Sequence, residues 1–489
     1  MAIIMVTFAF QLKTQPQMLG FRHFLLLAAL CVMGCQDSSQ SSEDSSRLSS
    51  EDLRLRTSGI VASMESSGRL DIPADGQRVG DVRMDDLHPL AERRVGQQAS
   101  ASQIPAFEIE AANGRLGVPS ARLLEQMRDP SIPPQVREVI QRIQLLRGSE
   151  IQATGAAEFE VRRRRNFRII DLATRTLPVS MSSPSGQDSF LQLIRFLLEA
   201  RLELAVSGNA DDIQSLYADV KALTERDANS KAAAEGVYTL ARFAHEMVRR
   251  NGEDEPVWFD NFCQWAREFA NRFPDQKQRA TALLLGSARS CELRALEIAG
   301  SSQGSSLMLL ATENYRQLVS QFSDSIAANE ATAVLRRLSL PGKQLSQFSG
   351  QTLDLQPIDG RTFVDVVTVV YFWDVNDPEF SDKLLPLLQQ AAEVSHGQLR
   401  FVGVALTDNQ FEFTEFLQRH HVPGIQMFGA DPDHRGWNHP LIRFWGLSRG
   451  STCWLIKRDR TVAAVDVTAS ELVNQMRALF PSSSVQAAQ

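Results

Sequence analysis

The run FVDVVTVVYFW, residues 363–373, is the feature that most constrains the fold of this chain. β-Branched and aromatic residues dominate it without polar alternation, which predicts a strand buried on both faces of a parallel or mixed sheet. The pattern after this run predicts an α/β domain. Its expected elements are a helix at 379–395, a strand at 399–406, a helix at 409–421, a hairpin turning at Arg458–Asp459 and a closing helix at 470–480. Pro386 should kink the first of these helices.

Residues 183–340 show a different, helical pattern. In the segment 190–205, apolar residues recur at spacings of three and four and form one helix face: Phe190, Leu193, Ile194, Leu197, Leu198 and Leu202. Similar spacing predicts further helices at 210–225, 229–249, 257–272, 278–298, 306–322 and 326–338. We expect an all-α, helical-repeat-like domain here, with its apolar stripes forming either a core or a concave protein-binding surface.

Between these two regions, TLDLQPIDG alternates polar and apolar residues and predicts a short hairpin that turns at Asp359–Gly360. Residues 104–182 are ambiguous. They contain two short helical patterns around a Pro-rich break, and EFEVRRRRNFRIIDLATRT is predicted to be extended or mixed. The basic run Arg162–Arg165 within it favours a solvated face over binding to an anionic lipid or polymer. A net charge of -7 argues against nucleic acid as a partner.

The N-terminus predicts export. Arg22 precedes an apolar run that is too short to span a bilayer, and Val32-Met33-Gly34-Cys35 resembles the lipobox of bacterial lipoproteins, which implies lipidation of Cys35 after cleavage. Residues 1–35 are thus predicted to be a signal peptide, with either Met1 or Met18 as the start. Residues 36–103, rich in serine, are predicted to be a disordered tether. An ordinary cleaved signal and an uncleaved anchor are the alternatives.

Three cysteines remain after the signal: Cys263, Cys291 and Cys453. None has CxxC spacing, and their odd number leaves at least one free thiol unless chains pair. Cys263 and Cys291 lie on neighbouring predicted helices. They either form a disulfide or remain buried free thiols, and the pattern favours the free thiols.

Residues 341–482 resemble the thioredoxin fold of membrane-linked thiol-disulfide oxidoreductases and the peroxiredoxin superfamily. The resemblance rests on the ordered segments VVTVVYFW, DKLLPLLQQ, LRFVGVAL, GWNHPLIRFWGL and CWLIKRDRTV. A helical domain followed by this module also resembles secreted thioredoxin-domain proteins of planctomycete type. In this fold family a Trp-Cys-x-x-Cys motif follows the central strand, and a cis-proline precedes the strand that faces the thiols.

This chain departs from both motifs. The resemblance places Asp377 and Phe380 where the two cysteines would stand, and Ser451 where the cis-proline would stand. Neither replacement can attack a disulfide, and a cis bond before serine costs several kcal/mol, so a trans loop is expected. Cys453 falls inside a predicted strand and is expected to be core.

The chain is therefore predicted to be an exported lipoprotein with a redox-inactive thioredoxin-like domain that binds envelope proteins or peptides. Its expected contacts are Trp373, Gly450, Ser451 and Thr452, with Trp437 as a further aromatic candidate, and no cofactor is expected. One alternative is a thiol-disulfide oxidoreductase or peroxidase-like enzyme that uses Cys453. Another is a hydrolase-like site at Asp377 and Glu379.

The acids at the end of the central strand have two interpretations. Asp374, Asp377 and Glu379 with His434 or His439 offer ligands to a divalent metal. The favoured interpretation is that Asp377, just before Pro378, caps a helix, so no metal site is predicted.

Overall fold

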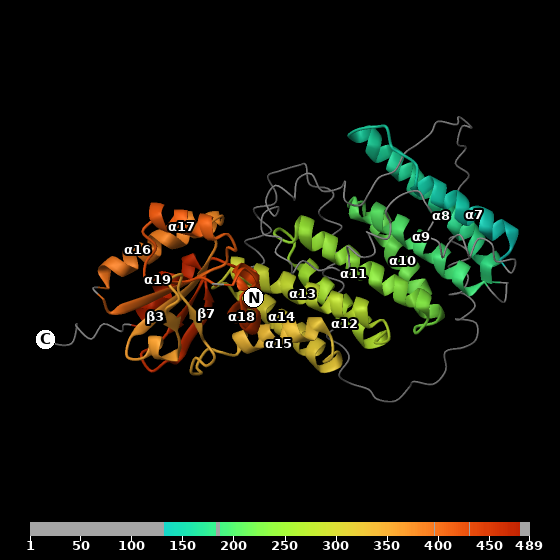
Figure 1. Ribbon diagram of the computed structural model, residues 1–489. Helices are drawn as coiled ribbons and strands as arrows, with labels where there is room; N and C mark the ends of the chain where they lie inside the picture. The colour runs from blue at the N-terminus through green and yellow to red at the C-terminus, as the bar shows by residue number, and fades with distance from the viewer. Residues whose placement is uncertain (1–131, 182–185, 396, 430, 480–489) are drawn as a thin grey trace, which may run out of the picture. The chain divides into compact units, whose positions relative to one another are not determined.

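The computed structural model describes residues 132–181, 186–395, 397–429 and 431–479 (Figure 1). All of them belong to one of the two compact units into which the chain divides, residues 62–489. The predicted signal peptide with Cys35, the predicted tether and the first helical pattern of the 104–182 segment lie outside the described residues.

The first part of the described chain is a series of helices, coloured from cyan to yellow in Figure 1. Each helix packs against the next, as short connections between helices require. The predicted helices of 183–340 are confirmed within a few residues. The helices are α7 (Pro134–Arg147), α8 (Ala156–Met181), α9 (Gln187–Val206), α10 (Ala210–Arg226), α11 (Lys231–Asn251), α12 (Val257–Arg272), α13 (Lys277–Glu297), α14 (Ser302–Gln321) and α15 (Ile326–Leu338).

Helix α8 corrects the prediction of an extended or mixed segment. Its ion pairs Arg162–Glu158 and Arg165–Glu203 hold charged side chains along the helix, so the alternation in EFEV does not mark a strand. The buried face continues through Ile169, Ile170 and Ala173, at helical spacing. The basic run therefore lies on a helix, and part of it packs against α9.

Small side chains let α11 lie at the centre of this helical core. Ala233, Ala241 and Ala244 are fully buried, and α11 contacts α9, α10, α12 and α13. At Gly236 a Cβ atom would come within 2.9 Å of Val220 on α10, so this helix pair depends on glycine for its close approach. One continuous apolar cluster results from α9 to α15.

The C-terminal part is built on a five-stranded mixed sheet in the order β5-β4-β3-β6-β7. β3 is central and parallel to β4, which is parallel to β5, whereas β6 runs antiparallel to β3 and β7 antiparallel to β6. Every residue of β3 is buried, as its sequence predicts. The strands are β3 (Val367–Trp373), β4 (Leu399–Ala405), β5 (Ile425–Met427), β6 (Thr452–Ile456) and β7 (Val462–Val467).

Helices cover both faces of this sheet. One face packs against α16, α17 and α19, through residues such as Leu388, Phe413 and Leu472. The other packs against α18 and the 340–363 segment. The helices are α16 (Leu385–Val394), α17 (Gln410–Arg419), α18 (Pro440–Trp445) and α19 (Ala469–Leu479). A π-helix, η4 (Phe380–Leu384), precedes α16. The 3-10 turns are η3 (Gly360–Phe363), η5 (Pro432–His434) and η6 (Gly436–Asn438).

Three details of this domain differ from the sequence predictions. The hairpin before the sheet, β1 (Gly350–Gln351) with β2 (Pro357–Ile358), turns before residue 357, and Asp359 instead caps η3. Pro386 is the second residue of α16 within a helical run that is continuous over residues 378–394, and the irregularity next to the proline is the π-helix that precedes α16. Strand β5 was not predicted, because three residues are too few to show a strand pattern.

A buried charged cluster joins the helices to the sheet. Arg337 on α15 lies between Glu292 on α13 and Asp466 on β7, and it also donates to the carbonyl of Gly446. Tyr315 donates a 2.6 Å hydrogen bond to Glu292. The side chains of Arg337 and Glu292 are fully buried, so the cluster shields three charges from water.

Candidate functional site

The candidate site lies where the central strand ends. After Trp373 the chain turns, and the Asp374 carboxylate accepts a 2.9 Å hydrogen bond from the Asn376 amide. Asp377 accepts one of the same length from the Glu379 amide and so caps the turn that leads into the π-helix. The predicted capping role of Asp377 is confirmed.

Asp377 also meets the loop that precedes β6. The Ser451 hydroxyl donates a hydrogen bond to the second carboxylate oxygen of Asp377, and the Ser451 amide donates to the carbonyl of Phe372 at 2.8 Å. The structure therefore brings together the two positions that the resemblance assigned to a cysteine and to the cis-proline. No peptide bond among the described residues is cis, in agreement with the expected trans loop, and Ser451 has a φ of 53°.

Phe380, at the second cysteine position, is a core residue. It is fully buried, and its ring stacks on Trp373 with centroids 4.9 Å apart. Trp373 is itself fully buried, and its indole N–H donates to Gln426. Trp373 was predicted to contact a ligand; in the structure, the end of β3 directs its ring into the layer between the sheet and α17.

The other predicted contacts lie in a closed loop. Gly450 is buried against Leu406, and Ser451 and Thr452 are 2% and 1% exposed. Their side chains are therefore covered unless the loop moves. Beside the loop, Arg449 pairs with Glu379 across the site. Sequence reasoning did not identify this pair, since its members lie in segments that only the sheet topology brings together.

Acidic side chains dominate the solvent-facing rim of the site. Burial raises the pKa of Asp374 above its ordinary value, and Asp377, Glu412 and Asp408 raise it further by repulsion. Asp408 is exposed, as is the neighbouring Phe411, 74% of whose surface is accessible. This end of the domain thus carries negative charge next to one exposed aromatic ring.

The two histidines considered as metal ligands have other roles. His434 pairs with Asp431 at 3.0 Å, and the His439 ring accepts a hydrogen bond from the Leu441 amide at the start of α18. Burial lowers the pKa of His439. Among the described residues, no three His, Cys, Asp or Glu side chains are grouped to hold a metal ion.

Cys453 lies inside β6, opposite Tyr371 of β3. The residue is fully buried, and burial raises the pKa of its thiol well above the ordinary value. A thiol attacks as the thiolate and needs access to its target. This placement does not support the alternative in which Cys453 is a displaced catalytic cysteine.

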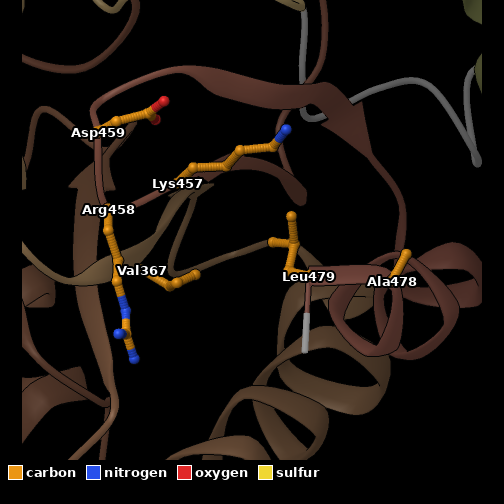
Figure 2. Close-up of a pocket in the computed structure, with 6 residues that line it drawn as sticks. All are labelled: Val367, Lys457, Arg458, Asp459, Ala478 and Leu479. Atoms are coloured by element: carbon orange, nitrogen blue, oxygen red, sulfur yellow. The ribbon is translucent and has the colours of Figure 1, made fainter. Parts of the chain in front are cut away.

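A cavity of about 490 Å³ lies elsewhere in the domain (Figure 2). Val367 starts β3, whereas the candidate site follows Trp373 at its end, about 20 Å along the strand. Figure 2 shows the hairpin turn and the end of α19 as its walls. The cavity is thus separate from the candidate site; its lining residues are Val367, Lys457, Arg458, Asp459, Ala478 and Leu479.

The strand order decides the fold. A central strand that leads into a helix, two parallel neighbours on one side, an antiparallel hairpin on the other and helices on both faces form the thioredoxin arrangement. The C-terminal domain has a thioredoxin-like fold.

Within the described residues, no helix combines the length and the apolar character needed to cross a membrane.

Comparison with known proteins finds similar solved structures for the C-terminal region. No protein-family model matches the chain, and no curated protein matches its sequence. Similar solved structures include dsbF of MTB, with 26% identity over 27% of this chain and 95% of that chain (TM-score 0.23). A putative thiol:disulfide interchange protein DsbE from Chlorobium tepidum shares 18% identity over 28% of this chain and 96% of its own (TM-score 0.25). A secreted disulfide oxidoreductase of Mycobacterium tuberculosis shares 20% over 27% and 96% (TM-score 0.23).

Proposed function

We propose that this chain is an exported lipoprotein whose thioredoxin-like domain has lost thiol chemistry and binds proteins or peptides of the cell envelope. The observation that carries the proposal is the contact between Asp377 and Ser451. A carboxylate occupies the position of the attacking sulfur, and it is held by the residue at the cis-proline position. Disulfide exchange requires a thiolate at that point, so this site cannot form a mixed disulfide.

The remaining thiol of the domain supports the same conclusion. Cys453 is the sole cysteine after residue 291 in the sequence, and it is enclosed in the sheet. A reaction there would require β6 to separate from β3, which would break the central pairing of the sheet. The thioredoxin-like domain therefore serves as a platform without its nucleophile.

The exposed rim indicates how a partner would bind. Asp408, Glu412 and Asp377 place negative charge around the end of β3, and Phe411 adds an exposed apolar contact. Charge complementarity favours a partner segment with Lys or Arg beside an apolar residue. We propose this rim, rather than the covered Gly450–Thr452 loop, as the surface that meets the partner.

An insulin-reduction assay with dithiothreitol tests the loss of chemistry. The full chain and the Cys453→Ser variant are both expected to give the rate of dithiothreitol alone. If the native chain reduces insulin faster than dithiothreitol alone and the Cys453→Ser variant does not, the proposal is overturned. A variant with Asp377→Cys and Phe380→Cys shows whether the platform still supports exchange; its thermal unfolding is checked first, because Phe380 belongs to the core.

Site-specific crosslinking tests the binding surface. A photoreactive residue replaces exposed Asn376 at the end of β3 or, as the matched control, exposed Asp459 in the hairpin turn near the other end of the strand. In cells that naturally produce the chain, defined envelope proteins should crosslink at position 376 and not at 459. Equal crosslinking at the two positions would contradict a partner surface at this rim.

Lipid attachment is tested separately. The wild-type chain is expected to incorporate labelled fatty acid and to remain with membranes, whereas Cys35→Ser should lose both properties. A wild-type chain released without label would contradict the anchor and leave the binding proposal in place.

A further inference from the structure

Two cysteines face each other across the contact between α12 and α13. The Sγ atoms of Cys263 and Cys291 are 3.3 Å apart, and the two residues are 0% and 1% exposed. A disulfide bond has a length of about 2.0 Å, so the two sulfur atoms need to approach by about 1.3 Å to bond. Small side-chain rotations on two packed helices cover such a distance.

We propose that Cys263 and Cys291 are oxidised to a structural disulfide that joins α12 to α13 when the chain folds in an oxidising compartment. Two S–H bonds break and one S–S bond forms. The two electrons and the two protons pass to the disulfide of a thiol-disulfide oxidant, such as glutathione disulfide, which is reduced to two thiols. The occurrence of this reaction in the cell rests on the export that is part of the proposed function.

Burial determines when the bond forms. Contact with Cys263 raises the pKa of the Cys291 thiol far above its ordinary value, and burial raises it further. Exchange needs a thiolate that an oxidant can reach, so the folded core resists oxidation. The reaction therefore belongs to the stage of folding before α12 and α13 are fully packed, and the same core then protects the bond from reductants.

The surroundings favour this pair over any other. Cys263 and Cys291 belong to one apolar cluster. Cys453 is buried in the sheet of the thioredoxin-like domain and belongs to a different cluster. The pair also lies next to the charged cluster, because Glu292 follows Cys291 directly on α13.

Peptide mapping tests the pair directly. The full chain is produced once in an oxidising compartment and once in a reducing cytoplasm, alkylated under denaturing conditions without reduction, and cut with trypsin. The oxidised sample should contain peptide 251–267 linked to peptide 290–294, two hydrogens lighter than the sum of the two. Alkylated Cys263 and Cys291 in that sample, or a link from either to Cys453, would overturn the proposal.

Thermal unfolding with and without dithiothreitol gives a second readout. A disulfide that closes a loop of this length stabilises a domain, so a chain reduced in denaturant and refolded with dithiothreitol should have a Tm roughly 5 to 10 °C below that of the oxidised chain. The matched control Cys453→Ser should keep this shift, and Cys263→Ser should lose it. An equal shift in Cys263→Ser would contradict the pair.

Refolding separates this inference from the proposed export. The reduced chain is unfolded and refolded with a glutathione redox buffer, which requires no export. Formation of the linked peptide there supports the cysteine pair even if the chain is found not to leave the cytoplasm. Refolding that yields only alkylated thiols overturns the pair and leaves the proposed function unaffected.

Discussion

The guanidinium of Arg337 on α15 lies 2.9 Å from the carboxylate of Asp466 on β7. The Arg337 side chain is fully buried, and it bonds Glu292 on its other side. One positive charge thus binds two buried carboxylates, and the hydroxyl of Tyr315 donates to a further carboxylate oxygen of Glu292. Arg337 is thus the cation that bonds both carboxylates at the junction of the helices and the sheet.

Replacing Arg337 by Met should lower the free energy of unfolding by about 3 to 5 kcal/mol, because Glu292 and Asp466 would remain buried without the cation that bonds both of them. Urea denaturation measures the loss. The deficit should shrink at pH 4.5, since burial and Glu292 raise the pKa of Asp466 and favour its neutral form once Arg337 is gone. The control Arg316→Met removes an exposed arginine of α14 and should change little.

His245 should make stability depend on pH. Burial lowers the pKa of its ring from 6.5 to about 4. Between these values the unfolded chain binds the proton more readily, so stability is complete above pH 6.5 and falls by up to about 3 kcal/mol as the pH drops to 4. Urea titrations at pH 7.5 and 4.5 should show a smaller loss for His245→Gln. The exposed His434→Gln should keep the wild-type loss.

Asp377 and Ser451 should be energetically coupled. A double-mutant cycle with Asp377→Ala and Ser451→Ala is expected to give a coupling energy of about 1.5 kcal/mol, as for a hydrogen bond to a charged group. The distant pair Asp459 and Ser451 should give none. Ser451→Gly should also be more stable than Ser451→Ala by about 1 kcal/mol, because the φ of 53° suits glycine. Equal stability of the two variants would argue against this backbone conformation.

Two phenylalanines offer a matched test of the site. Phe380→Ala should cost about 3 to 5 kcal/mol of stability, since it removes a fully buried ring between the sheet and α17. Phe411→Ala removes a ring that is 74% exposed and should stay within about 0.5 kcal/mol. Thermal denaturation ranks the two. A reversed order would contradict the assignment of Phe380 to the core and Phe411 to the rim.

Periodicity was sufficient for the regular elements. The helix predicted at 326–338 is α15 with the same ends, because its alanines and leucines alternate with polar residues at helical spacing. Periodicity did not predict α8, because charged residues that form ion pairs lie on the packed side of this helix and interrupt its apolar pattern. It did not predict β5 either, because pairing with β4 orders these three residues.

The site was predictable only in part. Resemblance to the thioredoxin fold was enough to place Asp377 and Ser451 at facing positions, since strand order fixes which loops meet. It did not show that Trp373 turns inward or that Arg449 reaches Glu379, because side-chain direction depends on packing by α17 and the β6 loop. Buried Arg337 left no pattern in the sequence at all.

The π-helix of residues 380–384 makes the length of this segment as important as its chemistry. A π-turn holds one residue more than an α-turn, so the residues on its two sides are out of phase. The preceding residues hold Asp377 against Ser451, and the following ones pack Leu385 and Leu388 onto the sheet. Deletion of a single residue, even exposed Asp382, would let the chain keep one of these contacts and lose the other.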